Sequence, residues 1–509
     1  MTPANKVIIN TAILYGRMIL TVGVSLYSTR LILEALGSTD YGIFELVAGI
    51  IAVLAFLKNT MATSTQRFLS FYQGKNDIEG QKSVFTNSLI MHIIVGVVIV
   101  AVLALLESYL FEHFLNIAEG RIYAAKIVYR TMLASLLFSM INVPFMGTLV
   151  AHENLLFVAV VNILEALLKL SIAFVLISLS GNRLIIYSYL MATLAFVTML
   201  MYTAFCFKKY IECSLRNVKI DKKQIKELSS FAGWNLFGAL CGLGRTQGMA
   251  VLLNLFFGTV INAAYGIANQ LAAQMYFLSA TMLRALNPQI MKSEGVDDRE
   301  RMLRLSMIAS KFGFFLVAII AIPAIFEMPQ ILKFWLKEVP EYTTIFAQFI
   351  LIAILINQLT IGLQSALQAT GKIKLYQTVV GGVILMTLPV AYIFLKMGFP
   401  PYYVFVSYLC LEVVGVILRI WIAKKIAGLS VPVYLNRVFM KSFFPTICSL
   451  VVCWFITRNI HFEYRFLFTG FASAVILLIS IYFKGLYHDE KILFQKAIMT
   501  IKTKILKYR

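Results

Sequence analysis

Long apolar stretches, separated by short polar turns, run through almost the whole of this 509-residue chain. A helix needs about 20 apolar residues to cross the hydrocarbon core of a bilayer. The sequence predicts fourteen such spans, six before a lysine-rich interruption at 208–228 and eight after it. They lie near 8–33, 41–66, 83–107, 122–147, 155–179, 184–207, 230–256, 260–288, 304–327, 343–368, 375–396, 403–423, 441–458 and 465–484. This pattern is typical of an all-α, multi-pass membrane protein.

Composition and charge agree with that prediction. Hydrophobic residues make up 60% of the chain and charged residues 14%, whereas soluble domains are about 45–50% apolar and about 25% charged. The net charge is +21, but 28 of the 45 basic residues fall on the termini and the loops of one predicted side, against 8 on the other. The positive-inside rule then places both termini in the cytoplasm. The charge therefore reflects topology and predicts no nucleic-acid partner.

A short repeat relates the two groups of spans. The first span ends at Leu36-Gly37 and the second opens with Tyr41-Gly42-Ile43, while Phe257-Gly258 and Tyr265-Gly266-Ile267 occupy the corresponding places after the seventh. Two halves in the same orientation form a parallel repeat, which is common in alternating-access transporters. We therefore predict two pseudo-symmetric six-helix lobes. The predicted division is an N-lobe at 1–207, a cytoplasmic linker at 208–229, a C-lobe at 230–423, two further spans within 424–484, and a cytoplasmic amphipathic tail at 485–509.

Nine basic residues lie within the predicted spans, where a charge near the bilayer centre costs about 2.5–3.5 kcal/mol on insertion scales. Lys311 and Arg419 are close enough to the inner interface that we expect both side chains to extend to it. Glu165 and Lys169 are four residues apart on one helix. This spacing favours structural neutralisation, with a proton-linked site as the alternative.

Polar stripes on the first two helices of each half predict a substrate site. Arg17 shares a helix face with Asn10, and Arg245 lies on a face rich in glycine. Such stripes face a polar cavity or a neighbouring helix rather than lipid, and arginine binds phosphate through paired hydrogen bonds. The alternative is polar contact between helices. The predicted substrate-binding residues are Arg17, Arg245, Arg130, Arg67, Asn10, Asn235 and Asn269.

Several of these residues also carry a family resemblance. The opening span with Asn10 and Arg17, the turn Leu36-Gly37…Asp40-Tyr41-Gly42-Ile43-Phe44, and Gln66-Arg67-Phe68 at the end of the second span resemble the polysaccharide transporters, the Wzx-type O-antigen and capsule flippases of the MATE/MOP superfamily. The resemblance implies a multi-pass protein of the bacterial inner membrane. It further implies that the chain moves undecaprenyl-pyrophosphate-linked oligosaccharide outward by alternating access.

Other functions stay open at this point. A lipid II flippase would share the span count, and a cation-coupled multidrug antiporter belongs to the same superfamily. Coupling to H⁺ or Na⁺ is therefore open, with Glu165 and Lys169 as the candidates. A membrane-embedded polymerase or glycosyltransferase is less favoured, because the sequence has no large exported loop, nucleophile triad or phosphate-binding glycine loop. We therefore expect no enzymatic activity and no cofactor. We also expect no metal site, since the six cysteines include no CxxC pair.

Overall fold

The computed structural model of the chain describes residues 3–52, 55–115, 117–214, 221–336, 338–488 and 490–491. Every regular element within these ranges is a helix, and they contain no β-strand. The predicted all-α architecture is therefore confirmed for these ranges. Most of the predicted amphipathic tail lies beyond Lys491, outside the described residues.

The helices divide into two compact units. The N-terminal unit is Ile9–Leu236, and the C-terminal unit is Phe237–Arg509 together with Met1–Ile8. The boundary falls inside one long helix, α9 (Lys222–Gly295), which begins within the segment that the sequence predicts as a linker. The finer division into lobes, linker and terminal spans stays a prediction.

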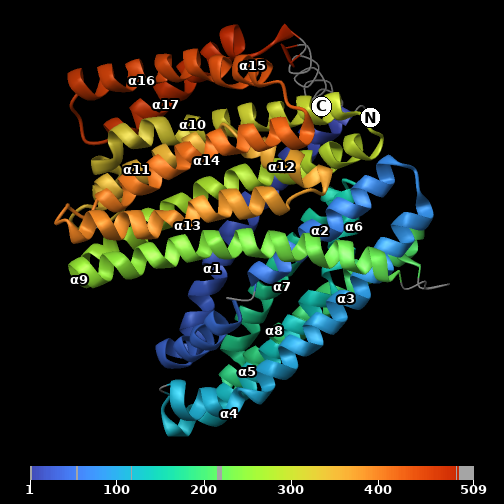
Figure 1. Cartoon of the computed structure of the whole chain (residues 1–509). Helices are drawn as coiled ribbons and strands as arrows, with labels where there is room; N and C mark the ends of the chain where they lie inside the picture. Colours follow the sequence, from blue (N-terminus) through green and yellow to red (C-terminus); the bar gives the residue numbers. More distant parts are fainter. Residues whose placement is uncertain are drawn as a thin grey trace, which may run out of the picture. The chain divides into compact units, whose positions relative to one another are not determined.

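The helices follow one another closely along the chain (Figure 1). Before α9 they are α1 (Pro3–Ala52), α2 (Ala55–Gly74), α3 (Ile78–Leu105), α4 (Glu107–Tyr109), η1 (Leu110–Phe114), α5 (Glu119–Ile141), α6 (Val143–Ala151), α7 (Leu155–Ser178), α8 (Arg183–Lys209) and η2 (Ile211–Cys213). After α9 they are α10 (Arg299–Trp335), α11 (Thr343–Gln358), α12 (Ile361–Thr370), α13 (Lys374–Lys396), α14 (Tyr403–Ala427), α15 (Val431–Tyr434), η3 (Leu435–Met440), α16 (Lys441–Asn459), α17 (Arg465–Ser480) and η4 (Ile481–Gly485).

The described residues contain 11 helices that are long and apolar enough to cross a membrane, or 12 if the bent pair α11 and α12 is one span. The predicted number of fourteen is not confirmed. The difference arises at α1, α2 and α9. In α9 two predicted spans join into one kinked helix, whereas the second predicted span, 41–66, begins in α1 after its kink and continues into α2, which is not among the helices counted. A straight helix of 74 residues, the length of α9, would measure about 110 Å, several times the roughly 30 Å of the hydrocarbon core. The kink at Gly258 therefore allows α9 to change direction instead of extending as one straight helix.

The two kinks fall at the glycines of the sequence repeat. Gly37 has φ 76° and ψ 166°, and Gly258 has φ 79° and ψ −169°. A side chain bearing a Cβ rarely adopts a φ in this range, whereas glycine does so readily. The repeated sequence therefore marks a repeated backbone conformation, once in each unit.

We expect Gly37→Ala and Gly258→Ala each to lower the stability of the protein by about 1–3 kcal/mol, the usual cost of such a strained conformation. No heavy atom lies within 4 Å of a Cβ built at either glycine, so the cost comes from the backbone alone. Gly16→Ala is the matched control, because its Cβ also meets nothing but its φ is helical, and alanine favours a helix. Thermal unfolding of the purified variants measures the difference. Equal melting temperatures for Gly37→Ala and Gly16→Ala would contradict the assigned strain.

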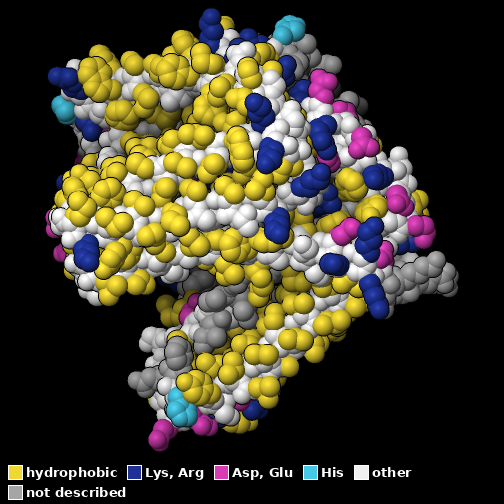
Figure 2. All heavy atoms as spheres, viewed as in Figure 1, with side chains coloured by type: hydrophobic (Ala, Val, Ile, Leu, Met, Phe, Trp, Pro, Cys, Tyr) yellow, Lys and Arg dark blue, Asp and Glu magenta, His cyan; other side chains and the backbone are white. Residues whose placement is uncertain are grey.

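The core of each unit is built from apolar and aromatic side chains. In the N-terminal unit Tyr129 and Tyr187 are buried between α1, α5 and α8, and in the C-terminal unit Phe346 and Phe405 are buried between α11 and α14. Large apolar side chains also cover the outer flanks of the helices (Figure 2); Ile19 and Phe471, for example, are 70% and 72% exposed. Such surfaces suit a lipid environment and not water.

Candidate functional site

A cluster of buried charges lies within the C-terminal unit, around Glu412 of α14. Its carboxylate accepts hydrogen bonds from Arg245 Nη1 of α9 at 3.3 Å, from Arg419 Nη1 at 3.0 Å and from Asn357 Nδ2 of α11 at 2.7 Å. The Glu412 side chain is 2% exposed. We call Arg245, Asn357, Glu412 and Arg419 the Glu412 cluster.

Tyrosines and a threonine enclose the two arginines. The Arg245 guanidinium carbon lies 4.2 Å from the centroid of the Tyr408 ring, and the hydroxyls of Tyr408 and Tyr276 are 3.1 Å apart. Arg419 donates to Thr360 Oγ1 at 3.2 Å. A cation over an aromatic face is stabilised, and more so away from water. These contacts fix both guanidinium groups in place.

The Glu412 cluster holds two cations and one anion, so it carries one excess positive charge. An uncompensated charge in a low-dielectric interior attracts a counter-ion strongly. Within the cluster Arg245 is the more accessible arginine, with 15% of its side chain exposed against 6% for Arg419. An anionic group reaching the cluster would therefore meet Arg245 first.

The local sequence explains why these residues meet. Glu412 and Arg419 are seven residues apart, which is two turns of α14, and Tyr408 is one turn before Glu412 on the same face. The sequence contained this signal, but Arg419 was instead expected to reach the inner interface. That expectation is wrong, because Arg419 is only 5% exposed. Packing against α12 and the polar contacts to Glu412 and Thr360 hold it inside the unit.

The structure also corrects the position expected for the Lys311 side chain. The same expectation was made for its side chain, yet Lys311 is 1% exposed and pairs with Glu490. The partner is 179 residues away along the chain, so the spacing of residues around Lys311 gave no sign of it.

The other predicted substrate-binding residue of the C-terminal unit lies near the cluster. Asn269 is close enough to the Tyr265 hydroxyl, and Tyr265 is close enough to Arg245, for each pair to interact electrostatically. Tyr265 in turn donates its hydroxyl to Thr246 O at 2.9 Å. The structure thus brings Arg245 and Asn269 into one polar region of the unit.

The N-terminal unit contains the remaining predicted residues. Asn10 Nδ2 donates to Glu153 O at 3.1 Å. Arg17 of α1 is half-buried, its Nε atom has no hydrogen-bond partner among the described residues, and Tyr202 is within electrostatic reach. Asn235, in the first part of α9, is buried.

Arg67 and Arg130 have very different surroundings. Arg67 is 6% exposed, and its guanidinium carbon lies 4.5 Å and 4.8 Å from the ring centroids of Phe68 and Phe71. Arg130 is exposed and forms a bidentate pair with Glu107, at 3.0 Å and 2.8 Å. The pairing already neutralises Arg130. The substrate-binding role predicted for each of these residues stays a prediction.

The ion-coupling candidates lie on α7. Glu165 interacts electrostatically with Lys58 of α2 as well as with Lys169, so one carboxylate faces two cations. Lys58 also lines a cavity of about 310 Å³ in the N-terminal unit. This arrangement is compatible with either the structural or the proton-linked interpretation.

Sequence reasoning looked for carboxylates in the spans and did not consider His92. This residue of α3 is buried, with Nδ1 2.6 Å from Ser88 O, and the Ser88 hydroxyl is 2.6 Å from that of Thr65. His92 Nε2 has no hydrogen-bond partner in the described part of the chain. His92 is therefore a further ionisable side chain inside the N-terminal unit.

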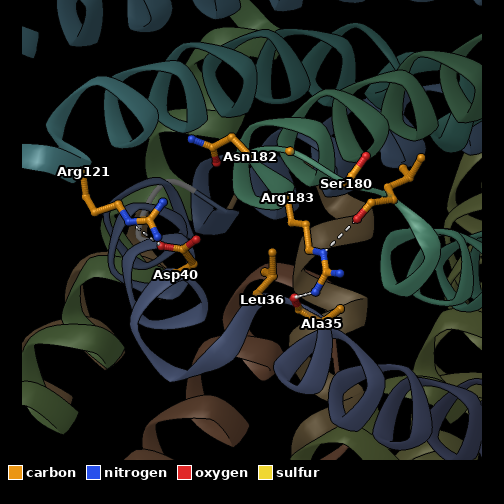
Figure 3. Close-up of a pocket in the computed structure, with 9 residues that line it drawn as sticks. Ala35, Leu36, Asp40, Arg121, Ser180, Asn182 and Arg183 are labelled. Atoms are coloured by element: carbon orange, nitrogen blue, oxygen red, sulfur yellow. Dashed lines mark hydrogen bonds and ion pairs between the residues drawn. The ribbon is translucent and has the colours of Figure 1, made fainter.

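A cavity of about 320 Å³ lies beside the kink of α1 in the N-terminal unit (Figure 3). Arg183 donates to Ala35 O, just before the kink, at 3.1 Å and to Leu179 O at 3.0 Å. Arg121 pairs with Asp40 at 3.3 Å. Backbone carbonyls at helix ends need such donors, so Arg183 stabilises the kink at Gly37.

Comparisons with known proteins agree with this architecture. A family model described as MatE matches residues 14–175, which lie within the N-terminal unit. The chain has the fold of a MATE transporter. Proteins of the MATE family are transporters and not enzymes. No match is found among curated protein sequences.

Three similar solved structures each cover 84% of this chain. A MATE protein in a straight conformation has a TM-score of 0.73 and 16% identity, with 97% of its own chain covered. A multidrug resistance MATE family transporter of the MOP superfamily, in an outward-facing conformation, has a TM-score of 0.72, 14% identity and 96% coverage. A MOP superfamily transporter from Pyrococcus furiosus has a TM-score of 0.70, 16% identity and 96% coverage.

Proposed function

We propose that this chain is a flippase of the bacterial inner membrane that moves undecaprenyl-pyrophosphate-linked oligosaccharide outward by alternating access, for the assembly of surface polysaccharide. The observation that supports this most directly is the excess positive charge of the Glu412 cluster. The substrate's pyrophosphate is an anion, and a buried cation in a transporter fold suits it.

In this proposal Arg245 binds the pyrophosphate from the C-terminal unit. Among the described contacts, Arg245 uses Nη1 for Glu412, and the other guanidinium nitrogens serve the phosphate oxygens. Glu412 acts as a fixed counter-ion that orients Arg245. We propose Arg17, which belongs to the N-terminal unit, as a further phosphate-binding residue, and Asn10, Asn235 and Asn269 as residues that bind sugar hydroxyls. Arg67 and Arg130 are weaker candidates, because aromatic rings surround the first and Glu107 neutralises the second.

The polarity of the pocket varies among proteins with this fold. The Pyrococcus furiosus transporter is described as having a binding pocket of reverse polarity, which suggests a different function for it. A change of charge at the site is therefore compatible with the fold. The Glu412 cluster supports the proposal that an anion is moved here.

The second candidate is a cation-coupled multidrug antiporter, supported by the multidrug transporter among the similar structures. An excess positive charge disfavours cationic drugs. Glu412 also already pairs with two arginines, so it is poorly suited to carry a proton or sodium ion. Glu165 and Lys169 are our candidates if transport is coupled to H⁺ or Na⁺. A lipid II flippase would need the same cations, so only the sugar distinguishes it.

Flipping by purified protein in proteoliposomes tests the proposal. We expect Arg17→Ala and Arg245→Ala each to slow the flipping of a polyprenyl-pyrophosphate oligosaccharide by about 10- to 100-fold, the effect of losing a charged hydrogen bond. Arg17→Lys and Arg245→Lys should flip lipid at rates between those of the unchanged protein and of the alanine variants, since lysine keeps the charge but loses the bidentate geometry. Lys396→Ala, at an exposed end of α13, is the control.

The same proteoliposomes separate the two candidate functions. Uptake of a cationic dye driven by an ion gradient, with no lipid flipping by the unchanged protein, would reject the flippase in favour of the antiporter. Unimpaired lipid flipping in both arginine variants would instead remove the roles proposed for Arg17 and Arg245. Lipid flipping that requires Arg17 and Arg245, without dye uptake, would support the flippase.

A further inference from the structure

Three cations surround one tyrosine ring near the C-terminal end of the described chain. The Tyr487 ring centroid lies 4.5 Å from Lys441 Nζ, 5.1 Å from the Arg437 guanidinium carbon and 5.2 Å from Lys311 Nζ. Arg437 belongs to η3, Lys441 begins α16, and Tyr487 follows η4. We call Arg437, Lys441 and Tyr487 the Tyr487 cluster.

The Glu490 carboxylate lies close to this cluster, but it binds Lys311 and a backbone N–H group. Glu490 pairs with Lys311 and accepts from the Tyr487 backbone N–H at 2.8 Å. The sequence has no aspartate or glutamate between Glu412 and Glu463, so α15, η3 and α16 bring no carboxylate. Neither Arg437 nor Lys441 forms an ion pair with any carboxylate that the structure describes. Among the described residues, these two cations are thus held close together without a counter-ion, at a cost in mutual repulsion.

Exposed apolar side chains adjoin these cations. Met440 is 64% exposed, Phe444 is 47% exposed, and each is three residues from Arg437 or Lys441 along η3 and α16. Phe483 of η4, which packs against α16, is 66% exposed. Lys441 and Phe444 lie in the α-helix α16, where side chains three residues apart share a face, and Met440 directly precedes Lys441. Cations and apolar groups therefore form one amphipathic surface, and its apolar part needs hydrocarbon to cover it.

We propose that the Tyr487 cluster binds the phosphate of an anionic phospholipid, whose acyl chain lies along Met440, Phe444 and Phe483. The phosphate supplies a counter-ion to Arg437 and Lys441, and Tyr487 holds the two cations at a fixed separation. A soluble anion would satisfy the charges but leave the apolar residues uncovered. This inference does not depend on the substrate that the protein transports.

Native mass spectrometry of the full-length protein tests the proposal. The protein is released from vesicles of phosphatidylcholine and phosphatidylglycerol in a three-to-one mixture, and the retained lipid is counted. We expect the unchanged protein to retain phosphatidylglycerol preferentially and the R437Q/K441Q variant to lose about 30-fold in affinity, because each basic residue near a membrane contributes about a factor of five. The K222Q/K223Q variant removes the same charge from an exposed segment beside Asp221 and should keep the lipid.

Three further measurements keep the test decisive. Y487L retains both cations but removes the ring between them, so it should also weaken retention. Excess inorganic phosphate should displace little of the lipid; complete displacement would show a soluble-anion site instead and overturn the proposal. Equal retention of phosphatidylcholine and phosphatidylglycerol by the unchanged protein would overturn it without any variant.

Discussion

Replacing Glu412 by glutamine is expected to lower the stability of the protein by about 3–5 kcal/mol, the usual cost of leaving a buried charge without its partner. The carboxylate is 2% exposed and is the acceptor for Arg245 and for Arg419. Glutamine keeps the shape of the side chain but leaves both guanidinium groups without an anion. Thermal unfolding of the purified protein, or titration with a denaturing detergent, measures the loss.

A second variant separates charge from packing. In E412Q/R419Q one cation is removed with the anion, so the cluster returns to its original net charge. We expect this double variant to recover a large part of the stability that E412Q loses, because coupled charges are not additive. Glu463→Gln, at an exposed site, should unfold like the unchanged protein. A melting temperature of E412Q equal to that of Glu463→Gln would show that the cluster needs no anion.

The variants also bear on transport. If Glu412 only orients Arg245, then E412Q should still flip lipid at a reduced rate and should not alter its dependence on an ion gradient. An abolished gradient dependence in E412Q, with flipping retained, would instead identify Glu412 as a coupling residue and would remove the role of fixed counter-ion.

Local features of the fold could be predicted from the sequence. Membrane-crossing helices follow directly from apolar runs of sufficient length. The repeated Leu36-Gly37 and Phe257-Gly258 pairs indicated the places where each half changes direction, and the structure has a positive φ at both glycines. What the pattern could not tell is whether a kinked helix ends there or continues. The fourteen predicted spans therefore exceed the helices counted.

The candidate site was predictable only in part, because its partners are distant in the sequence. Arg245 was predicted from its own helix face, but Glu412 is 167 residues away. The depth of Arg419 was inferred from its distance to the end of a span, whereas its burial depends on packing against another helix. A helical face identifies which side of a residue is polar. It does not identify the residue that meets it.

We expect the second large loss of stability when a buried ion pair between α10 and α17 is broken. Glu327 is 1% exposed, and Arg465 binds it at both carboxylate oxygens, with Nε–Oε1 at 2.9 Å and Nη2–Oε2 at 3.0 Å. Thr469 donates to the same carboxylate at 2.7 Å. Arg465 also donates to the carbonyls of Thr457 and Ile460 at the end of α16. One arginine thus joins the terminal helix pair to the rest of the C-terminal unit.

We expect Arg465→Met to lower stability by about 3–5 kcal/mol, because it leaves the Glu327 carboxylate buried with only a hydroxyl donor. Arg458→Met, an exposed arginine near the end of α16, is the matched control and should change the melting temperature little. Since Arg465 holds α17 to α10, protease cleavage between α16 and α17 should also become faster in Arg465→Met and stay slow in Arg458→Met.

A double-mutant cycle distinguishes the charge pair from the helix contacts that surround it. Glu327→Gln alone leaves Arg465 with two carbonyl acceptors and a partly exposed side chain, so it should cost less than Arg465→Met. E327Q/R465M removes both charges and should be more stable than Arg465→Met alone. If the double variant instead loses the sum of the two single effects, the ion pair is not the interaction that holds α17. The carbonyl contacts of Arg465 would then account for the stability that Arg465→Met loses.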